Sequence, residues 1–114
     1  MEFLTTIKEQ LPDWAKDIRL NLDAVIARST LAPEDAVGAA LSAAYAARSP
    51  VLVEAFKSGL SEADANAALT ASALMGMNNT WYPYVEMTGD AQLKSLPAQL
   101  RMNCLLYTSD AADE

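Results

Sequence analysis

The chain has 114 residues, of which 52% are hydrophobic and 20% charged, a balance that suits one small globular domain and excludes an intrinsically disordered chain. A formal net charge of −7 argues against nucleic acid or an anionic membrane surface as a partner. Histidine is absent and there is a single cysteine, Cys104, so a Ser-His-Asp triad and an internal disulfide are both excluded within this chain.

Two features of the sequence indicate a cytoplasmic protein with no membrane partner. Each apolar stretch is interrupted well before the roughly 18 residues that a membrane-spanning helix needs. The N-terminus, MEFLTTIKEQLPDWAKD, has an early glutamate and lacks the basic region and long apolar run of a signal peptide. A lone cysteine also suits a reducing compartment.

The first two segments predict amphipathic helices separated by Pro12. Apolar residues recur at three- and four-residue steps before this proline: Phe3, Leu4, Ile7 and Leu11. Asp13 can cap the next helix. That helix would carry an apolar stripe made of Trp14, Ile18, Leu22 and Val25. The side chains expected on its opposite side are Lys16, Arg19 and Asp23.

A third helix is predicted from Pro33, which is a favoured first helical residue. Its alanine-rich body has strong helix propensity and lets a neighbouring helix approach closely; the larger side chains in it are Val37, Leu41 and Tyr45. A short helix through Phe56 is expected to start at Ser49-Pro50 and to stop at Gly59.

The remaining segments also predict helix. Ser61–Asp64 resembles a capping box and opens a helix with one face made of Ala65, Leu69, Ala73 and Met77. This helix is expected to end between Asn78 and Pro83, because asparagine tolerates a left-handed turn and proline prevents continuation. Gly89-Asp90 marks a loop, and the weakly helical residues that follow are interrupted by Pro97. No alternating run of β-branched residues occurs, so the chain is predicted to be all-α.

Two pairs of neighbouring carboxylates are the first candidates for chemistry: Glu34 with Asp35, and Glu62 with Asp64. A metal site or a general acid needs carboxylates that converge in a cleft. Both pairs fall instead in expected first turns, where negative charge is stabilising by about 0.3–1 kcal/mol. We interpret them as helix-terminal features. There is also no glycine-rich nucleotide loop, and we expect no cofactor and no metal.

A group of sulfur-containing and aromatic side chains is the second candidate, because it could line a pocket: Met75, Met77, Trp81, Tyr82 and Tyr84. Core packing with the polar tips in solvent is the interpretation that we favour. Cys104 lacks the second thiol that C-x-x-C chemistry requires. The residues alone therefore predict a helical body without a catalytic constellation.

Several blocks, taken in order, resemble the N-terminal half of the AhpD alkylhydroperoxidases. They are LPDWAKDIRLNL at Leu11–Leu22, the alanine-rich helix with its Arg48, MGMNN at Met75–Asn79 with Tyr82, and LRMN at Leu100–Asn103. The resemblance covers residues 1–103. One departure is Ala32, where the family often places an aspartate that caps the third helix.

This resemblance implies an all-α, AhpD-like helical domain of which only the N-terminal half is present. It implies a homotrimeric, antioxidant alkyl hydroperoxide reductase, which is a thiol peroxidase and a disulfide reductase. Its partners would be a peroxiredoxin and lipoyl-bearing dehydrogenase components. The family's catalytic residues are a C-x-x-C pair, a following histidine and an upstream glutamate, all beyond the matched region. No catalytic, cofactor-binding or metal residue is therefore assigned to this chain, and Cys104 aligns with neither family cysteine.

The C-terminal residues resemble something different. CLLYTSDAAD is what one reading frame gives for a transposase adapter used in sequencing-library preparation. We therefore expect residues 1–103 to be an AhpD-like N-terminal helical region and residues 104–114 to be a non-native, adapter-derived tail. Removing the tail removes the only cysteine and 3 of the 15 acidic residues, so 12 acidic and 8 basic residues leave a net charge of −4.

Three functional hypotheses follow. The chain is a fragment of an AhpD-type peroxidase that is inactive by itself, or a non-catalytic helical interaction module, or an unrelated enzyme that uses the carboxylates or the Met/Tyr group. The uncut gene separates the first two. A downstream C-x-x-C with a histidine supports the fragment, whereas a native stop codon after Asn103 excludes it.

If the chain is a fragment, its helices should bury their apolar faces only in part. We expect far-UV circular dichroism to show helix while the dye ANS binds to exposed apolar surface. A sharp cooperative melt without ANS fluorescence would contradict this expectation.

Overall fold

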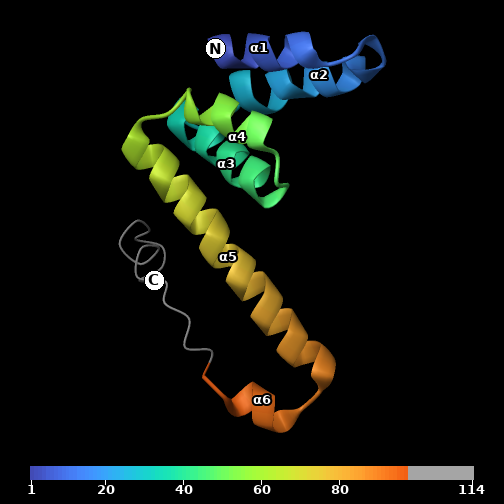
Figure 1. Ribbon diagram of the computed structural model, residues 1–114, viewed down its shortest axis with the longest axis vertical. Helices are drawn as coiled ribbons and strands as arrows, with labels where there is room; N and C mark the ends of the chain where they lie inside the picture. The colour runs from blue at the N-terminus through green and yellow to red at the C-terminus, as the bar shows by residue number, and fades with distance from the viewer. Residues whose placement is uncertain (98–114) are drawn as a thin grey trace. The chain divides into compact units, whose positions relative to one another are not determined.

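The regular elements of the chain are all helical. The computed structural model shown in Figure 1 describes residues 1–97. In chain order its elements are α1 (Glu2–Gln10), the 3-10 helix η1 (Asp13–Ala15), α2 (Lys16–Leu22), the π-helical turn η2 (Asp23–Ala27), α3 (Pro33–Ala46), α4 (Pro50–Lys57), α5 (Glu62–Thr88) and α6 (Ala91–Ser95). No strand occurs among these residues, so the all-α prediction is confirmed for them. Cys104 and the expected boundary after Asn103 lie outside the described residues.

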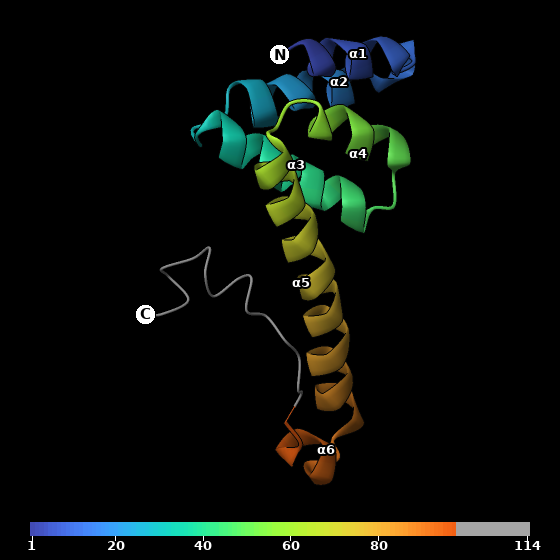
Figure 2. The same ribbon diagram turned by 60° about the vertical axis from the view of Figure 1, so that its left-hand side comes forward.

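The chain divides into two units, residues 1–69 and residues 70–114. The first unit contains α1 to α4 and the start of α5. Both Figure 1 and Figure 2 show α1 beside α2 and α3 beside α4, and α1 also packs on α4. The described part of the second unit, residues 70–97, holds the rest of α5 and α6.

The first unit is organised around one apolar cluster. Its buried side chains come from α1, η2, α3, α4 and α5: Leu4, Ile7, Ile26, Val37, Leu41, Ala44, Phe56 and Ala65. Leu41 is 0% exposed, and no polar or charged side chain of the described residues is buried. Alanines on α3 keep its surface flat, so α4 and the start of α5 can approach it closely. Ser42 uses this proximity, since its Oγ donates a hydrogen bond to the Ala68 carbonyl at 2.9 Å.

Three of the predicted helix starts are confirmed. α3 begins at Pro33 behind Ala32, whose side chain forms no cap. The Ser49 Oγ accepts a hydrogen bond from the Leu52 N–H at the start of α4. The Ser61 Oγ accepts one from the Asp64 N–H at the start of α5. These starts were predictable because a cap involves only residues within one helical turn.

The predicted apolar stripe of the second helix is wrong for three of its four residues. Trp14 is 83% exposed, and Ile18 and Val25 are also exposed, whereas Leu22 is partly buried and packs on the apolar cluster as predicted. The other side chains that turn inward come one residue later than the exposed three: Ala15 and Ile26 are buried, and Arg19 is partly buried. Both sets have helical spacing, so local periodicity could not choose between them. Asp13 is the first residue of η1, and its side chain forms no cap.

The expected end of the helix near Asn79 is also wrong. α5 continues through Asn78, Asn79 and Pro83 and ends at Thr88. Proline removes one backbone donor, but the other hydrogen bonds of a 27-residue helix remain. The actual stop is Gly89, whose φ of 65° is left-handed. Asp90 then caps α6 through a hydrogen bond from the Gln92 N–H to its Oδ1, at 2.8 Å, which agrees with the predicted Gly89-Asp90 loop.

Gly59, which was expected to stop the fourth helix, has a packing role. α4 ends at Lys57, and the ring of Phe3 occupies the place that a Cβ on Gly59 would need. This ring is held in turn by an edge-to-face contact with Phe56, with ring centroids 5.9 Å apart. The absence of a side chain at position 59 therefore lets α1 pack against the end of α4.

We predict that Gly59→Ala destabilises the chain by about 1–3 kcal/mol, because the new methyl group must displace the Phe3 ring. Gly38→Ala is the matched control, since Gly38 lies inside α3 and a Cβ there meets nothing within 4 Å. The control should be stabilised by about 0.5–1 kcal/mol through helix propensity. Urea unfolding followed by circular dichroism measures both. An equal change in the free energy of unfolding in the two variants would show that the contact between Phe3 and Gly59 does not contribute to stability.

Candidate functional site

The two acidic pairs lie where the sequence placed them. Glu34 and Asp35 are in the first turn of α3, and Glu62 and Asp64 are in the first turn of α5. Among residues 1–97, no three acidic, histidine or cysteine side chains come together in a group that could hold a metal ion. The first-turn positions of the two acidic pairs agree with a role in stabilising helix N-termini.

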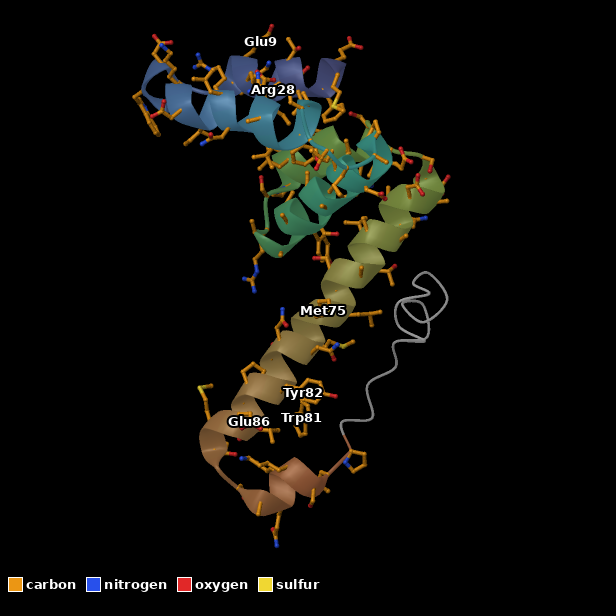
Figure 3. The ribbon with its side chains drawn as sticks, turned by 180° about the vertical axis from the view of Figure 1, so that it is seen from behind. Glu9, Arg28, Met75, Trp81, Tyr82 and Glu86 are labelled. Carbon is orange, nitrogen blue, oxygen red and sulfur yellow. The ribbon has the colours of Figure 1, made fainter. Side chains whose placement is uncertain are left out.

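The sulfur-containing and aromatic group does not form a core. Met75, Met77, Tyr82 and Tyr84 are 44–53% exposed, and Trp81 is partly buried. Figure 3 shows Met75, Trp81 and Tyr82 along α5. The interpretation as core packing is therefore wrong for these side chains in the described structure. Sequence composition identified them as apolar but carried no information on whether another element packs on them.

An open pocket of about 340 Å³ lies in the first unit, at the connection between α1 and α2. It is lined by Thr5, Lys8, Glu9, Leu11, Asp13 and Arg19. The Lys8 Nζ lies 2.9 Å from Oδ1 and 3.1 Å from Oδ2 of Asp23. This partly buried ion pair joins α1 to η2.

Arg19 is the lining residue that makes hydrogen bonds to the backbone next to the pocket. Its Nη2 donates hydrogen bonds to the carbonyl oxygens of Leu11 and Pro12, at 2.9 and 3.0 Å. These two carbonyls lie just beyond the end of α1, and the Pro12 oxygen also accepts a hydrogen bond from the Ala15 N–H of η1, at 2.9 Å. The Arg19 Nε is buried and forms no hydrogen bond. Arg19 therefore fixes the connection between α1 and α2 through its Nη2 group.

The chemistry available in this pocket is limited. Its charged side chains are two cations and two carboxylates, and neither a thiol nor an imidazole is present to act as nucleophile or base. We assign the pocket a structural role in joining α1 to α2. Arg19 was expected on the side of the second helix opposite its buried stripe; the alternative stripe of Ala15, Leu22 and Ile26 was the signal that could have placed it correctly.

We predict that Arg19→Lys destabilises the chain by about 1–2 kcal/mol, because a single ammonium group cannot replace a planar guanidinium spanning two carbonyls. Arg28→Lys is the control, since the exposed Arg28 lies at the end of the same helical segment. Thermal unfolding of both variants measures the difference. An unfolding temperature for Arg19→Lys equal to that of the control would contradict the proposed clamp.

No helix in residues 1–97 combines the length and the hydropathy that crossing a membrane requires. No protein-family model matches the chain, and no solved structure matches it.

Curated proteins do match the chain, and the following three are named alkyl hydroperoxide reductase AhpD. The protein from Rhodospirillum centenum is 44% identical over 106 residues, which cover 90% of this chain and 57% of the relative. The protein from Bradyrhizobium sp. (strain BTAi1) is 40% identical, covering 87% of this chain and 57% of the relative. One from Coxiella burnetii is 39% identical, covering 90% and 62%.

The chain thus spans about three-fifths of the length of these relatives. The identity is well above the level at which chance similarity is a concern, and it extends over nearly all of this chain. Over nearly all of its own length, this chain is therefore similar to part of the alkyl hydroperoxide reductase AhpD proteins.

Proposed function

We propose that this chain is part of an AhpD-type alkyl hydroperoxide reductase, and that it is inactive as it stands. The observation that carries the proposal is its 37–44% identity to proteins of that name over about 90% of its length. The function of the whole protein would be antioxidant: it would reduce hydroperoxides with a pair of thiols and exchange disulfides with a peroxiredoxin partner.

The hydroperoxide reduction that the resemblance implies uses two thiols of one protein and a group that moves protons. A thiolate attacks the hydroperoxide, an alcohol leaves, and the resulting sulfenic acid condenses with the second thiol to give a disulfide and water. This chain has one cysteine and no histidine. In our proposal the C-x-x-C pair, its histidine and its glutamate belong to the part of the protein that the chain does not span.

We further propose that residues 1–103 are the AhpD-like region and that residues 104–114 are not native to the protein. The matched share of this chain supports this division, because 103 of 114 residues is 90% and the relatives match 87–90%. The adapter-like sequence CLLYTSDAAD supports it independently.

The assembly and the partners are proposed on the resemblance alone. The whole protein would be a cytoplasmic homotrimer that receives electrons from lipoyl-bearing dehydrogenase components.

A second candidate function is a non-catalytic helical interaction module. Its support is the exposed apolar surface of α5, which includes Met75, Tyr82 and Tyr84. A native stop codon directly after Asn103 in the source gene would favour this alternative over the fragment.

We predict no hydroperoxide turnover above background when the chain is assayed with tert-butyl hydroperoxide and dihydrolipoamide. The Cys104→Ser variant is the control and should give the same rate as the unaltered chain, because the chain has no histidine that could activate the Cys104 thiol. Cys104-dependent turnover would contradict the proposal. Joining residues 1–103 to the unmatched part of the Rhodospirillum centenum relative should produce thiol-dependent turnover.

A further inference from the structure

The part of α5 in the second unit has apolar side chains on several faces. Successive helical residues are about 100° apart, so positions seven residues apart nearly coincide. Met75 and Tyr82 form one such pair and project from one face (Figure 3). Met77 and Tyr84 form a second pair on a face roughly 200° away. All four are 44–53% exposed.

A third face of the same helical segment is covered. It carries Leu74 and Trp81, which are partly buried, and Val85, which is 7% exposed. In the described structure, one apolar face of this segment is therefore largely covered, and two others are in contact with solvent.

The same segment has an unusual charge distribution. Residues 65–85 contain no aspartate, glutamate, lysine or arginine, although 20% of the whole chain is charged. A helix that faces water normally carries charge on its outer side, whereas a helix with apolar residues all round lies inside a protein. The segment is not apolar enough to cross a membrane. Its pattern is that of a central helix in a protein core.

We propose that these two exposed faces of α5 are the packing surface for helices in the part of an AhpD-length chain that this chain does not span. The inference rests on the proposed function. The Rhodospirillum centenum relative has 43% of its length outside the match, and since 106 residues are 57%, this part is about 80 residues long. Such a length provides several helices of average size.

The geometry favours this occupant over a second copy of the chain. A two-fold contact through one face of α5 would leave the opposite face in water. Residues 65–85 also have no charged side chain with which a copy could fix a register. Several helices joined in one polypeptide can cover both faces at once.

The test measures how accessible the methionine sulfur atoms are in two proteins. One is the chain as it stands, and the other joins residues 1–103 to the unmatched part of the Rhodospirillum centenum relative. Each is treated with dilute hydrogen peroxide, which converts exposed thioethers to sulfoxides, and peptide mass spectrometry gives the rate at each methionine. Met1, which is 50% exposed, is the internal reference.

In the chain alone, Met75 and Met77 should be oxidised at rates similar to that of Met1, at all protein concentrations. In the fusion, both should be oxidised at least ten times more slowly, with Met1 unchanged. Unchanged rates at Met75 and Met77 in the fusion would overturn the proposal, whatever the fold of that protein. Protection in the chain alone that grows with concentration would overturn it in favour of a second copy.

A pair of variants adds a second readout. Tyr82→Lys in the fusion should restore oxidation of Met75, which lies on the same face of α5, because a buried lysine cannot remain charged beside an apolar partner. Asn66→Lys is the control, since it adds a charge at an exposed polar position of α5, and it should leave Met75 protected. Equal oxidation of Met75 in both variants would contradict the proposal.

Hydroperoxide turnover of the fusion is scored separately. Protected methionines without turnover would support the packing surface and contradict the proposed function. Turnover with accessible methionines would do the reverse.

Discussion

The structure of the first unit depends on the burial of Leu41. This side chain lies on α3 at the centre of a cluster to which α1, η2, α4 and the start of α5 each contribute at least one buried residue. Because no buried side chain in residues 1–97 is polar or charged, the cluster is held by apolar contact alone. The specific polar contacts lie around it. The Lys8–Asp23 ion pair and the Arg19 hydrogen bonds join elements whose separation the cluster has already set.

In the described part of the second unit, most large apolar side chains are exposed instead of buried. Val85 is its buried hydrophobic side chain in the described residues, while most of the large apolar residues of α5 face solvent. Most helical stability in proteins comes from burial of an apolar face, and this part of α5 buries little of its apolar surface. The chain spans about three-fifths of the length of its AhpD relatives. In our proposal, the exposed apolar surface of α5 packs on helices from the remaining part of such a protein.

Much of the fold could be predicted from the sequence because it is decided locally. Pro33, Ser49 and Ser61 each start a helix through contacts within one turn, and the structure confirms them. The errors concern long-range packing. The second helix has two stripes with equal spacing, and only its contacts with the rest of the first unit select the one that contains Ile26. The environment of Met75 and Tyr82 depends on segments elsewhere in the protein. The catalytic residues that the family resemblance implies could not be placed on any residue of this chain.

The absence of charge along α5 has a consequence for how this protein can be cut. Trypsin cleaves after lysine and arginine, and the chain has neither between Lys57 and Lys94. Limited digestion with trypsin therefore cannot report on the order of α5, however far this helix opens in solution. A protease that cleaves after aromatic residues can do so, because Trp81 and Tyr84 lie in the C-terminal third of α5. The choice of protease thus decides whether opening of α5 is visible to digestion at all.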